Sequence, residues 1–325
     1  MTLPKIGITL GDPGGIGPEI VLKSLYHQSE SLSEAHYVLF GSSLILEREK
    51  QNLGLKLDIP PYRNCLPPSP SLSLWEVEIP LQSTKIGSAS KENGLASFLF
   101  FQEAVKSASQ GRIQAVVTAP VSKKAWKMAG ITYSGHTDFL NHEFPRAIMA
   151  FWSDRLKVVL FTHHLPLGKA VEKIKKKPLY DFFILLDQEL NKIQQRTFEI
   201  LVAGLNPHAG EEGLMGIEEK EEIRPAVQKA KEKGVNISGP FPPDVVFRKA
   251  LHSPSKIVIA LYHDQGLIPF KLESFYEGVN LTLGLPFIRT SPDHGTAFDI
   301  AGQGVANPQS MIRAINLACE LSPLL

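Results

Sequence analysis

The chain has 325 residues, a length that favours two compact units over one core. Its formal net charge of +1 gives no reason to expect nucleic acid or an anionic membrane as a general partner. Two cysteines do not make a disulfide framework, and no apolar stretch reaches the ~18 residues of a membrane span. Because the first residues also lack a secretory signal pattern, a soluble cytoplasmic protein is predicted.

Apolar runs that suit short buried strands alternate with helical patterns along the chain. Strands are expected at residues 5–10, 37–40, 115–118, 157–161, 199–203 and 257–262, and helices from about Pro18 and over 95–109. The Pro/Ser-rich stretch 64–73 is expected to be a surface loop, and the lysine run 173–178 a solvated helix end. This alternation of strands and helices predicts an α/β fold with a largely parallel sheet. In such a sheet, ligands bind beyond the carboxyl ends of the strands.

Three histidines share one context, just past an apolar strand. His164 follows the run 157–161, His208 follows 199–203, and His263 follows 257–262. If these strands are parallel, the three imidazoles reach the same edge of the sheet. Neutral imidazoles suit a divalent ion such as zinc, cobalt, nickel, iron or manganese, whereas magnesium prefers oxygen ligands. The alternative is that each is a hydrogen-bonded loop histidine.

Two neighbours of these histidines leave choices open. His163 and His164 are adjacent and face opposite ways on an extended segment, so only one is expected to be a ligand, and spacing does not choose between them. Asp264 follows His263, and it could accept a hydrogen bond from an imidazole or serve as a turn residue.

Two further motifs also have two interpretations. The glycine-rich stretch GDPGGIGPE, residues 11–19, could hold an anion at a helix N-terminus or form a tight structural turn. It matches neither the dinucleotide fingerprint nor a P-loop. Ser122 in TAPVSK could suggest a nucleophile, but no serine-hydrolase elbow surrounds it, which favours the start of a helix.

Polar side chains near several strand boundaries suit a small anionic substrate. The motif GHTDFL offers His136 and Thr137, and the segment after residue 270 offers Lys271, Asn280 and Arg289. Two cations and an amide fit a phosphorylated or carboxylated molecule, with surface salt bridging as the alternative.

The motifs together resemble a known family. GITLGDPGGIGPEI, TAPVSK, GHTDFL, HLPL, GLNPHAGEEGLMGIEE, YHDQGLIPFK and DHGTAFDIAGQGVANP run in order across nearly the whole chain. This set closely resembles the 4-hydroxythreonine-4-phosphate dehydrogenase family of pyridoxal phosphate biosynthesis. The first and last motifs are also similar to those of isocitrate and isopropylmalate dehydrogenases.

The resemblance implies a two-lobed isocitrate/isopropylmalate-dehydrogenase-like fold with a cleft between the lobes, in a homodimer. One lobe would comprise roughly residues 1–120 with 285–325, and the other about 121–284. The family's metal ligands fall on His164, His208 and His263, which chooses His164 over His163, and the metal site is shared with the dimer partner. Zinc, cobalt or manganese is favoured over magnesium.

The resemblance also assigns the remaining site residues. Substrate contacts fall on His136, Thr137, Lys271, Asn280 and Arg289. Lys271 and Asp244 are candidates for the general base, with a metal-bound water as a third. The related decarboxylating dehydrogenases place the cofactor's adenosine against the loop 294–307, which makes cofactor-binding candidates of four of its residues: His294, Gly295, Asp299 and Asn307.

The implied activity is NAD- or NADP-dependent oxidation of 4-phosphohydroxy-L-threonine to an amino-oxo acid that decarboxylates to 3-amino-2-oxopropyl phosphate. Alternatives are a dehydrogenase of 4-phosphothreonate or 4-phosphoerythronate, a phosphotransacetylase-type acyltransferase, and a non-catalytic metal-binding protein. Leu214 replaces a histidine that is usual in the family, which leaves the fine substrate preference open.

Overall fold

The structure is a computed structural model that describes residues 3–27, 35–63, 71–79, 85–193 and 198–322. The chain divides into two compact units. Unit 1 comprises Met1–Pro145 and Leu285–Pro323, and unit 2 comprises Arg146–Gly284, for the residues described. Unit 1 is thus built from both ends of the chain. The first division lies at Pro145 rather than near residue 120.

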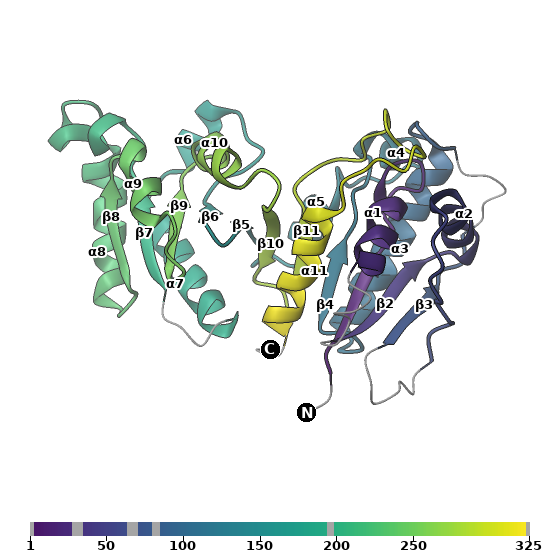
Figure 1. The fold of residues 1–325 in the computed structure, drawn as a ribbon. Helices are drawn as coiled ribbons and strands as arrows, with labels where there is room; N and C mark the ends of the chain where they lie inside the picture. Colours follow the sequence, from purple (N-terminus) through teal and green to yellow (C-terminus); the bar gives the residue numbers. More distant parts are fainter. Residues whose placement is uncertain (1–2, 28–34, 64–70, 80–84, 194–197, 323–325) are drawn as a thin grey trace. The chain divides into compact units, whose positions relative to one another are not determined.

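A parallel sheet forms the centre of unit 1 (Figure 1). Its strand order is β3-β2-β1-β4-β11, and every pair of neighbours is parallel. Strands buried along their whole length, such as β2 and β4, are typical of a parallel sheet covered on both faces. The strands are β1 (Lys5–Thr9), β2 (His36–Gly41), β3 (Ser71–Glu76), β4 (Ala115–Thr118) and β11 (Ile288–Pro292).

Helices of unit 1 pack on this sheet, with α3 against β1 and α11 against β11. The helices are α1 (Gly17–His27), α2 (Ser43–Leu53), α3 (Lys91–Ser109), α4 (Lys123–Met128), α5 (His136–Glu143) and α11 (Gln309–Leu321). Trp126 of α4 is fully buried, and its indole donates a hydrogen bond to Ser97 of α3. Phe139 of α5 contacts Phe101 of α3. These contacts explain why residues 121–145 belong to unit 1.

Unit 2 contains a mixed sheet with strand order β10-β5-β6-β9-β7-β8. Strand β5 is antiparallel to both of its neighbours, whereas β6, β9, β7 and β8 are mutually parallel. The prediction of an α/β fold with largely parallel strands is confirmed, with β5 as the exception. The strands are β5 (Ile148–Trp152), β6 (Lys157–Leu160), β7 (Glu199–Ala203), β8 (Ile237–Phe241), β9 (Lys256–Ala260) and β10 (Val279–Leu283).

Unit 2 has five α-helices among its described residues, and two short non-α turns follow strand β7 in the chain. Their bounds are α6 (Leu167–Lys173), α7 (Lys176–Ile193), the 3-10 helix η2 (Pro207–Gly213), the π-helical turn η3 (Glu219–Ile223), α8 (Arg224–Glu232), α9 (Pro243–Ala250) and α10 (His263–Ser274). Phe270 of α10 and Val246 of α9 are fully buried in one apolar cluster with residues of β5, β6, β7 and β9. Across the described ranges, no helix combines the length and apolar composition that a bilayer crossing requires.

The predicted strands correspond to β1, β2, β4, β6, β7 and β9, whereas β3, β5, β8, β10 and β11 were not predicted. Ser122 accepts a hydrogen bond from the Ala125 amide and so caps α4, which confirms the helix start over the nucleophile. The lysine run lies exposed at the end of α6 and the start of α7. The loop predicted at 64–73 is wrong for residues 71–73, which begin the edge strand β3 (Ser71–Glu76), and residues 64–70 lie outside the described residues.

The glycine-rich stretch after β1 forms a tight turn closed by Asp12. The Asp12 carboxylate accepts a hydrogen bond from the Gly14 amide at 2.9 Å, and the Asp12 amide donates to Pro120 O at 2.9 Å. Gly11 has φ +69°, and a Cβ there would lie 2.5 Å from Pro120 O, so only glycine fits. Burial raises the pKa of Asp12 to about 6, although hydrogen bonds from the Gly14 and Ser122 backbone oppose this.

Replacing Asp12 should change the pH dependence of stability. Because the folded state holds the Asp12 proton more tightly than the unfolded state, its ionisation destabilises the fold as pH rises from 3.8 through about 6. We expect the stability advantage of Asp12→Asn over wild type to grow by up to about 3 kcal/mol between pH 4 and pH 8. Urea unfolding at both pH values measures it, with Asp181→Asn at an exposed carboxylate as the control. A difference that is independent of pH would contradict the burial effect.

Candidate functional site

The three histidine-bearing loops leave neighbouring parallel strands of unit 2. Strand β9 lies between β6 and β7 and is parallel to both. His164 follows β6, His208 follows β7, and His263 follows β9. Since parallel neighbours end at the same edge of a sheet, the predicted common edge is confirmed for these loops.

His164 and His263 lie close together at this edge. Their ring centroids are 5.8 Å apart, with an angle of 38° between the ring planes. His263 is the first residue of α10, and its Nδ1 shares a 2.7 Å hydrogen bond with the Asp264 carboxylate. A carboxylate on Nδ1 selects the tautomer whose Nε2 is a lone-pair donor. Asp264 therefore orients the imidazole and also occupies the first turn of the helix.

His208 is held apart in its own turn. It lies in η2 with φ 52°, and its Nδ1 is 3.5 Å from the Glu211 carboxylate. His164 also has φ 52°, a left-handed conformation that is uncommon for residues other than glycine and concentrates at functional sites. Within the described part of one chain, no three His, Cys, Asp or Glu side chains converge as a set able to hold a metal ion. Imidazole donors of this kind fit a divalent ion.

His163 contacts the His164 ring and, unlike His164, is partly buried. Burial, with the neighbouring His164 and His263, lowers the pKa of His163 to about 4. A buried imidazole with this pKa is neutral at physiological pH. The His163 and His164 rings meet edge to face at a centroid distance of 5.2 Å, so His163 packs against the outer ring.

Buried polar side chains tie the three strand ends together. Gln265 accepts a hydrogen bond from the Leu261 amide and donates one to Gly204 O, both at 2.7 Å, which joins the end of β9 to the end of β7. Thr162 donates to Leu261 O at 2.7 Å and joins β6 to β9. Sequence reasoning missed these residues because an isolated Gln or Thr has no motif.

A buried glutamate orders the loop that leads to His208. The Glu219 carboxylate is 1% exposed and accepts hydrogen bonds from the Leu205 amide, the Asn206 amide and the Asn206 side chain, at 2.7–2.8 Å. Three donors on one carboxylate compensate for its burial. The geometry of the His208 turn therefore depends on a residue that follows it in sequence.

Unit 1 contains a second polar group, centred on Arg289 of β11. Arg289 is 3% exposed, and its Nη2 donates to Thr118 Oγ1 at 2.7 Å and lies 3.3 Å from His136 Nδ1. Burial lowers the pKa of Arg289 to about 10, so it remains a cation at neutral pH. The structure brings two of the predicted substrate-binding residues, His136 and Arg289, together with Thr118 at the end of β4.

His136 is held neutral in this group. Burial, and secondarily the Arg289 cation, keep the pKa of His136 well below its usual range. The ring packs against Phe101 and Trp126 at centroid distances of 4.4 and 5.6 Å. If Nδ1 accepts from Arg289, Nε2 carries the proton, and in the described part of the chain that buried atom has no hydrogen-bond partner. His136 Nε2 is therefore a donor that suits a ligand oxygen.

The other predicted substrate and base residues occupy separate elements. Thr137 is half-buried in the first turn of α5. Lys271 lies in the last turn of α10, and Asn280 lies in β10 opposite Phe151 of β5. Asp244 is exposed in the first turn of α9, where a carboxylate also stabilises the helix dipole. Lys271 shares its helix with His263.

The predicted cofactor residues lie in the loop 293–308, which joins β11 to α11 in unit 1. His294, Gly295 and Asp299 are exposed, and a Cβ on Gly295 would meet nothing within 4 Å. Asn307 Oδ1 accepts from the Gln309 amide at 2.9 Å, which forms an Asx turn just before α11. The loop is close to the glycine-rich turn, since the Ile16 amide donates to Thr296 O at 2.9 Å. An exposed loop against a glycine turn fits an extended nucleotide.

Comparison with known proteins shows similarity along almost the entire chain. Residues 33–318 match the family described as pyridoxal phosphate biosynthetic protein PdxA. The chain is 40% identical over 321 residues to a 4-hydroxythreonine-4-phosphate dehydrogenase of Aquifex aeolicus, covering 98% of each protein. It is 38% identical to a D-threonate 4-phosphate dehydrogenase of Salmonella typhimurium, covering 99% of this chain and 100% of that protein. The crystal structure of 4-hydroxythreonine-4-phosphate dehydrogenase from Klebsiella pneumoniae aligns with a TM-score of 0.86 at 38% identity, covering 98% of each chain. The chain belongs to the pyridoxal phosphate biosynthetic protein PdxA family.

Proposed function

We propose that the protein is a dehydrogenase that oxidises the secondary alcohol of 4-phosphohydroxy-L-threonine, in pyridoxal phosphate biosynthesis. The observation that supports this most directly is the His164–His263 pair, with Asp264 on His263 Nδ1, at the carboxyl edge of the unit 2 sheet. The family membership and the Aquifex aeolicus relative favour the same substrate.

His164, His208 and His263 would hold a divalent ion, with zinc, cobalt or manganese favoured by imidazole donors. Such an ion, when bound, lowers the pKa of an alcohol and polarises a carbonyl. The chain's own contribution is to hold the imidazoles in one tautomer and position. Asp264 does this for His263, and the tie from Gln265 fixes the strand end beside it.

The anionic ends of the substrate would meet Arg289, Lys271 and Asn280. Arg289 is held by Thr118 at 2.7 Å, so its cation is preorganised rather than flexible. His136 would donate from Nε2 to a substrate oxygen, because its neutral state leaves that atom protonated. Thr137, next in α5, adds a hydroxyl donor.

NAD or NADP, when bound, would accept the hydride from the alcohol carbon while a base takes the hydroxyl proton, and the oxo acid would then lose carbon dioxide and take up a proton at carbon to give 3-amino-2-oxopropyl phosphate. Lys271 and Asp244 are the candidate bases from this chain. Lys271 is the stronger candidate of the two because it shares α10 with His263, whereas Asp244 is on α9. The loop 293–308 would hold the adenosine half of the dinucleotide.

A second copy of the chain would complete the metal site. Among the described residues of a single chain, no three metal-binding side chains come together, which is compatible with a site shared between copies. An exposed apolar stripe also follows His263 along α10 and just past its end, at positions spaced to lie on one helix face: Ile268, Leu272, Phe275 and Tyr276, with exposures of 61%, 82%, 67% and 67%. Four large apolar side chains left exposed on one stripe are typical of an interface between subunits. We therefore propose a homodimer with a shared metal site.

A dehydrogenase of D-threonate 4-phosphate is the second candidate. The Salmonella typhimurium relative of that name is 38% identical, against 40% for the Aquifex aeolicus relative, so identity does not separate the two substrates. Of the two molecules, only 4-phosphohydroxy-L-threonine bears an amine. Leu214, where the resemblance to the family implies a histidine, is 85% exposed at the end of the turn that contains His208.

Reduction of NAD or NADP should distinguish these substrates. We expect an increase in absorbance at the reduced nicotinamide band with 4-phosphohydroxy-L-threonine, in the presence of zinc, cobalt or manganese, and its loss on chelation. D-threonate 4-phosphate is assayed in parallel. A higher kcat/KM for that acid would replace the first substrate by the second. No reduction with either acid and any of the three metals would contradict the proposed function.

Asp264→Asn should weaken metal binding without unfolding the protein. An amide cannot provide the negative charge that fixes the His263 tautomer, and second-sphere losses of this kind lower metal affinity by about 10-fold. Isothermal titration with zinc measures the affinity, and circular dichroism checks the fold. Asp181→Asn, at an exposed carboxylate on α7, is the matched control. Equal zinc affinity for Asp264→Asn and wild type would remove Asp264 from the metal site.

A further inference from the structure

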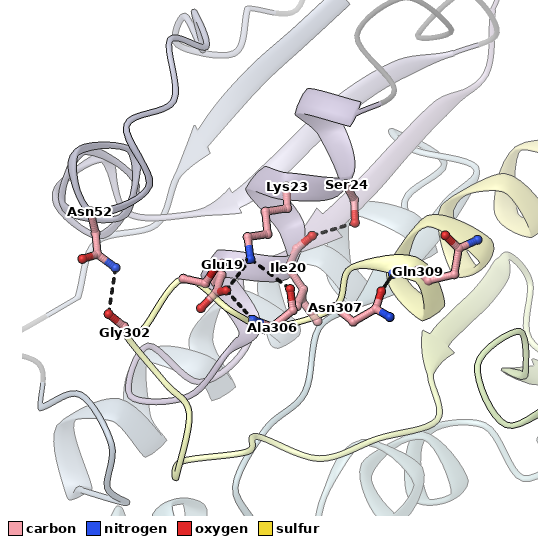
Figure 2. Close-up of polar contacts among 10 residues, drawn as sticks. Glu19, Ile20, Lys23, Ser24, Asn52, Gly302, Ala306, Asn307 and Gln309 are labelled. Atoms are coloured by element: carbon pink, nitrogen blue, oxygen red, sulfur yellow. Dashed lines mark hydrogen bonds and ion pairs between the residues drawn. The ribbon is translucent and has the colours of Figure 1, made fainter.

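The loop 293–308 is long and contains no helix or strand, yet it is held firmly at one point. Loops of this length in a compact unit are usually functional or disordered. Here two side chains from one turn of α1, Glu19 and Lys23, bind the backbone of residues 304–306 (Figure 2). We call these two residues the α1 clamp.

The α1 clamp consists of one ion pair and three hydrogen bonds between a charged side chain and the backbone. Lys23 Nζ lies 2.7 Å from Glu19 Oε1, and it donates to Gly304 O at 2.7 Å and to Ala306 O at 2.9 Å. The Ala306 amide donates to Glu19 Oε1 at 2.7 Å. Both the carbonyl and the amide of Ala306 are therefore bound by charged groups, which form stronger hydrogen bonds than neutral ones.

Burial makes this clamp more effective than a surface ion pair. The Glu19 side chain is 1% exposed and the Lys23 side chain 18%. In such surroundings each charge depends on the other, because removal of one leaves the other buried without its partner. Most exposed lysine pairs of the chain, such as Lys177 with Asp181, have no such dependence.

Further contacts hold the earlier part of the loop. Asn52 of α2 donates to Gly302 O at 3.2 Å, and the Ile16 amide donates to Thr296 O at 2.9 Å (Figure 2 shows the Asn52 contact). Gly15 lies so close to Thr296 that a Cβ there would be 2.6 Å from the Thr296 carbonyl oxygen. The exposed residues His294, Gly295 and Asp299 are thus presented by a backbone that is fixed on both sides.

We propose that Glu19 and Lys23 are positioning residues that set the affinity for the dinucleotide, by holding the loop 293–308 in its binding conformation. This inference rests on the proposed role of that loop in binding the adenosine half of NAD or NADP. A preorganised loop loses less conformational freedom when the nucleotide binds. Because the adenosine is remote from the carbon that accepts the hydride, the clamp should affect cofactor binding and not the chemical step.

The test replaces Lys23 by methionine, which keeps the length of the side chain and removes its charge. We expect amides of residues 302–307 to exchange with deuterium about 10-fold faster in the cofactor-free protein, because the loop opens more often. We also expect KM for the dinucleotide to rise about 10-fold while kcat stays within about twofold. Glu19→Gln, which keeps an acceptor for the Ala306 amide, should give a smaller change in both.

Lys50→Met is the matched control. Lys50 of α2 is 17% exposed, close to the value for Lys23, and its Nζ donates to Glu47 at 2.9 Å rather than to the loop, so Lys50→Met removes a lysine–glutamate pair of the same unit without removing a bond to the loop backbone. Faster exchange and weaker cofactor binding in Lys23→Met alone support the clamp. If Lys23→Met matches Lys50→Met in exchange, or keeps the wild-type KM, the clamp is refuted while the proposed function stands.

A different result would refute the proposed function itself. If wild type neither binds nor reduces a dinucleotide, as measured by NADH and NADPH fluorescence titration, the cofactor role of the clamp is refuted together with that function. The exchange measurement remains interpretable in that case, because it uses protein without cofactor. Should Lys23→Met not be recovered folded, Glu19→Gln is judged by the same criteria.

Discussion

The parallel arrangement of β6, β9 and β7 is the constraint on which the candidate metal site depends. Parallel neighbours end at one edge, so a residue placed just past each strand is delivered to the same region whatever the length of the helices between them. The apolar cluster under these strands, with Phe270 and Val246 fully buried, fixes their register. The buried strands therefore hold in place the loops that carry the three histidines.

Side chains must bind backbone groups just past the strand ends, because the loops there leave the regular backbone hydrogen bonding of the sheet. Gln265 and Thr162 bind the amide and the carbonyl of Leu261 just after β9, and Glu219 binds the Leu205 amide after β7. The left-handed conformations of His164 and His208 persist within this frame. Strain of this kind lasts only where the surroundings fix it, and fixed donors are what a metal-binding edge requires.

The sequence predicted the strands that bear the histidines, because their apolar runs are unbroken and end at polar residues. It missed β3, since Ser71–Glu76 is half polar and follows a Pro/Ser-rich stretch that indicated a loop. Spacing could not choose between His163 and His164, or between the two roles of Asp264. The structure gives His163 a burial-lowered pKa, and it shows that Asp264 orients His263 from within the first helical turn.

Partners distant in sequence were beyond prediction for a simple reason. Thr118 meets Arg289, and Glu19 meets Ala306, only because β4 lies beside β11 and α1 lies against the loop after it. No local pattern encodes such pairs, whereas capping by Ser122 and the turn at Gly11 involve neighbours and could be predicted. The family resemblance predicts which residues bind ligands, and the structure adds the residues that hydrogen-bond to some of them, such as Thr118 to Arg289.

The central claim is that His164, His208 and His263 bind one divalent ion, with side chains drawn from two copies of the chain. Anomalous diffraction at the zinc edge, from crystals of zinc-loaded protein, tests it most directly. The account predicts an anomalous peak about 2.0–2.1 Å from a nitrogen of each of the three histidines, at an interface formed by the α10 stripe. A peak bound by other side chains, or no peak despite full zinc loading, would contradict it.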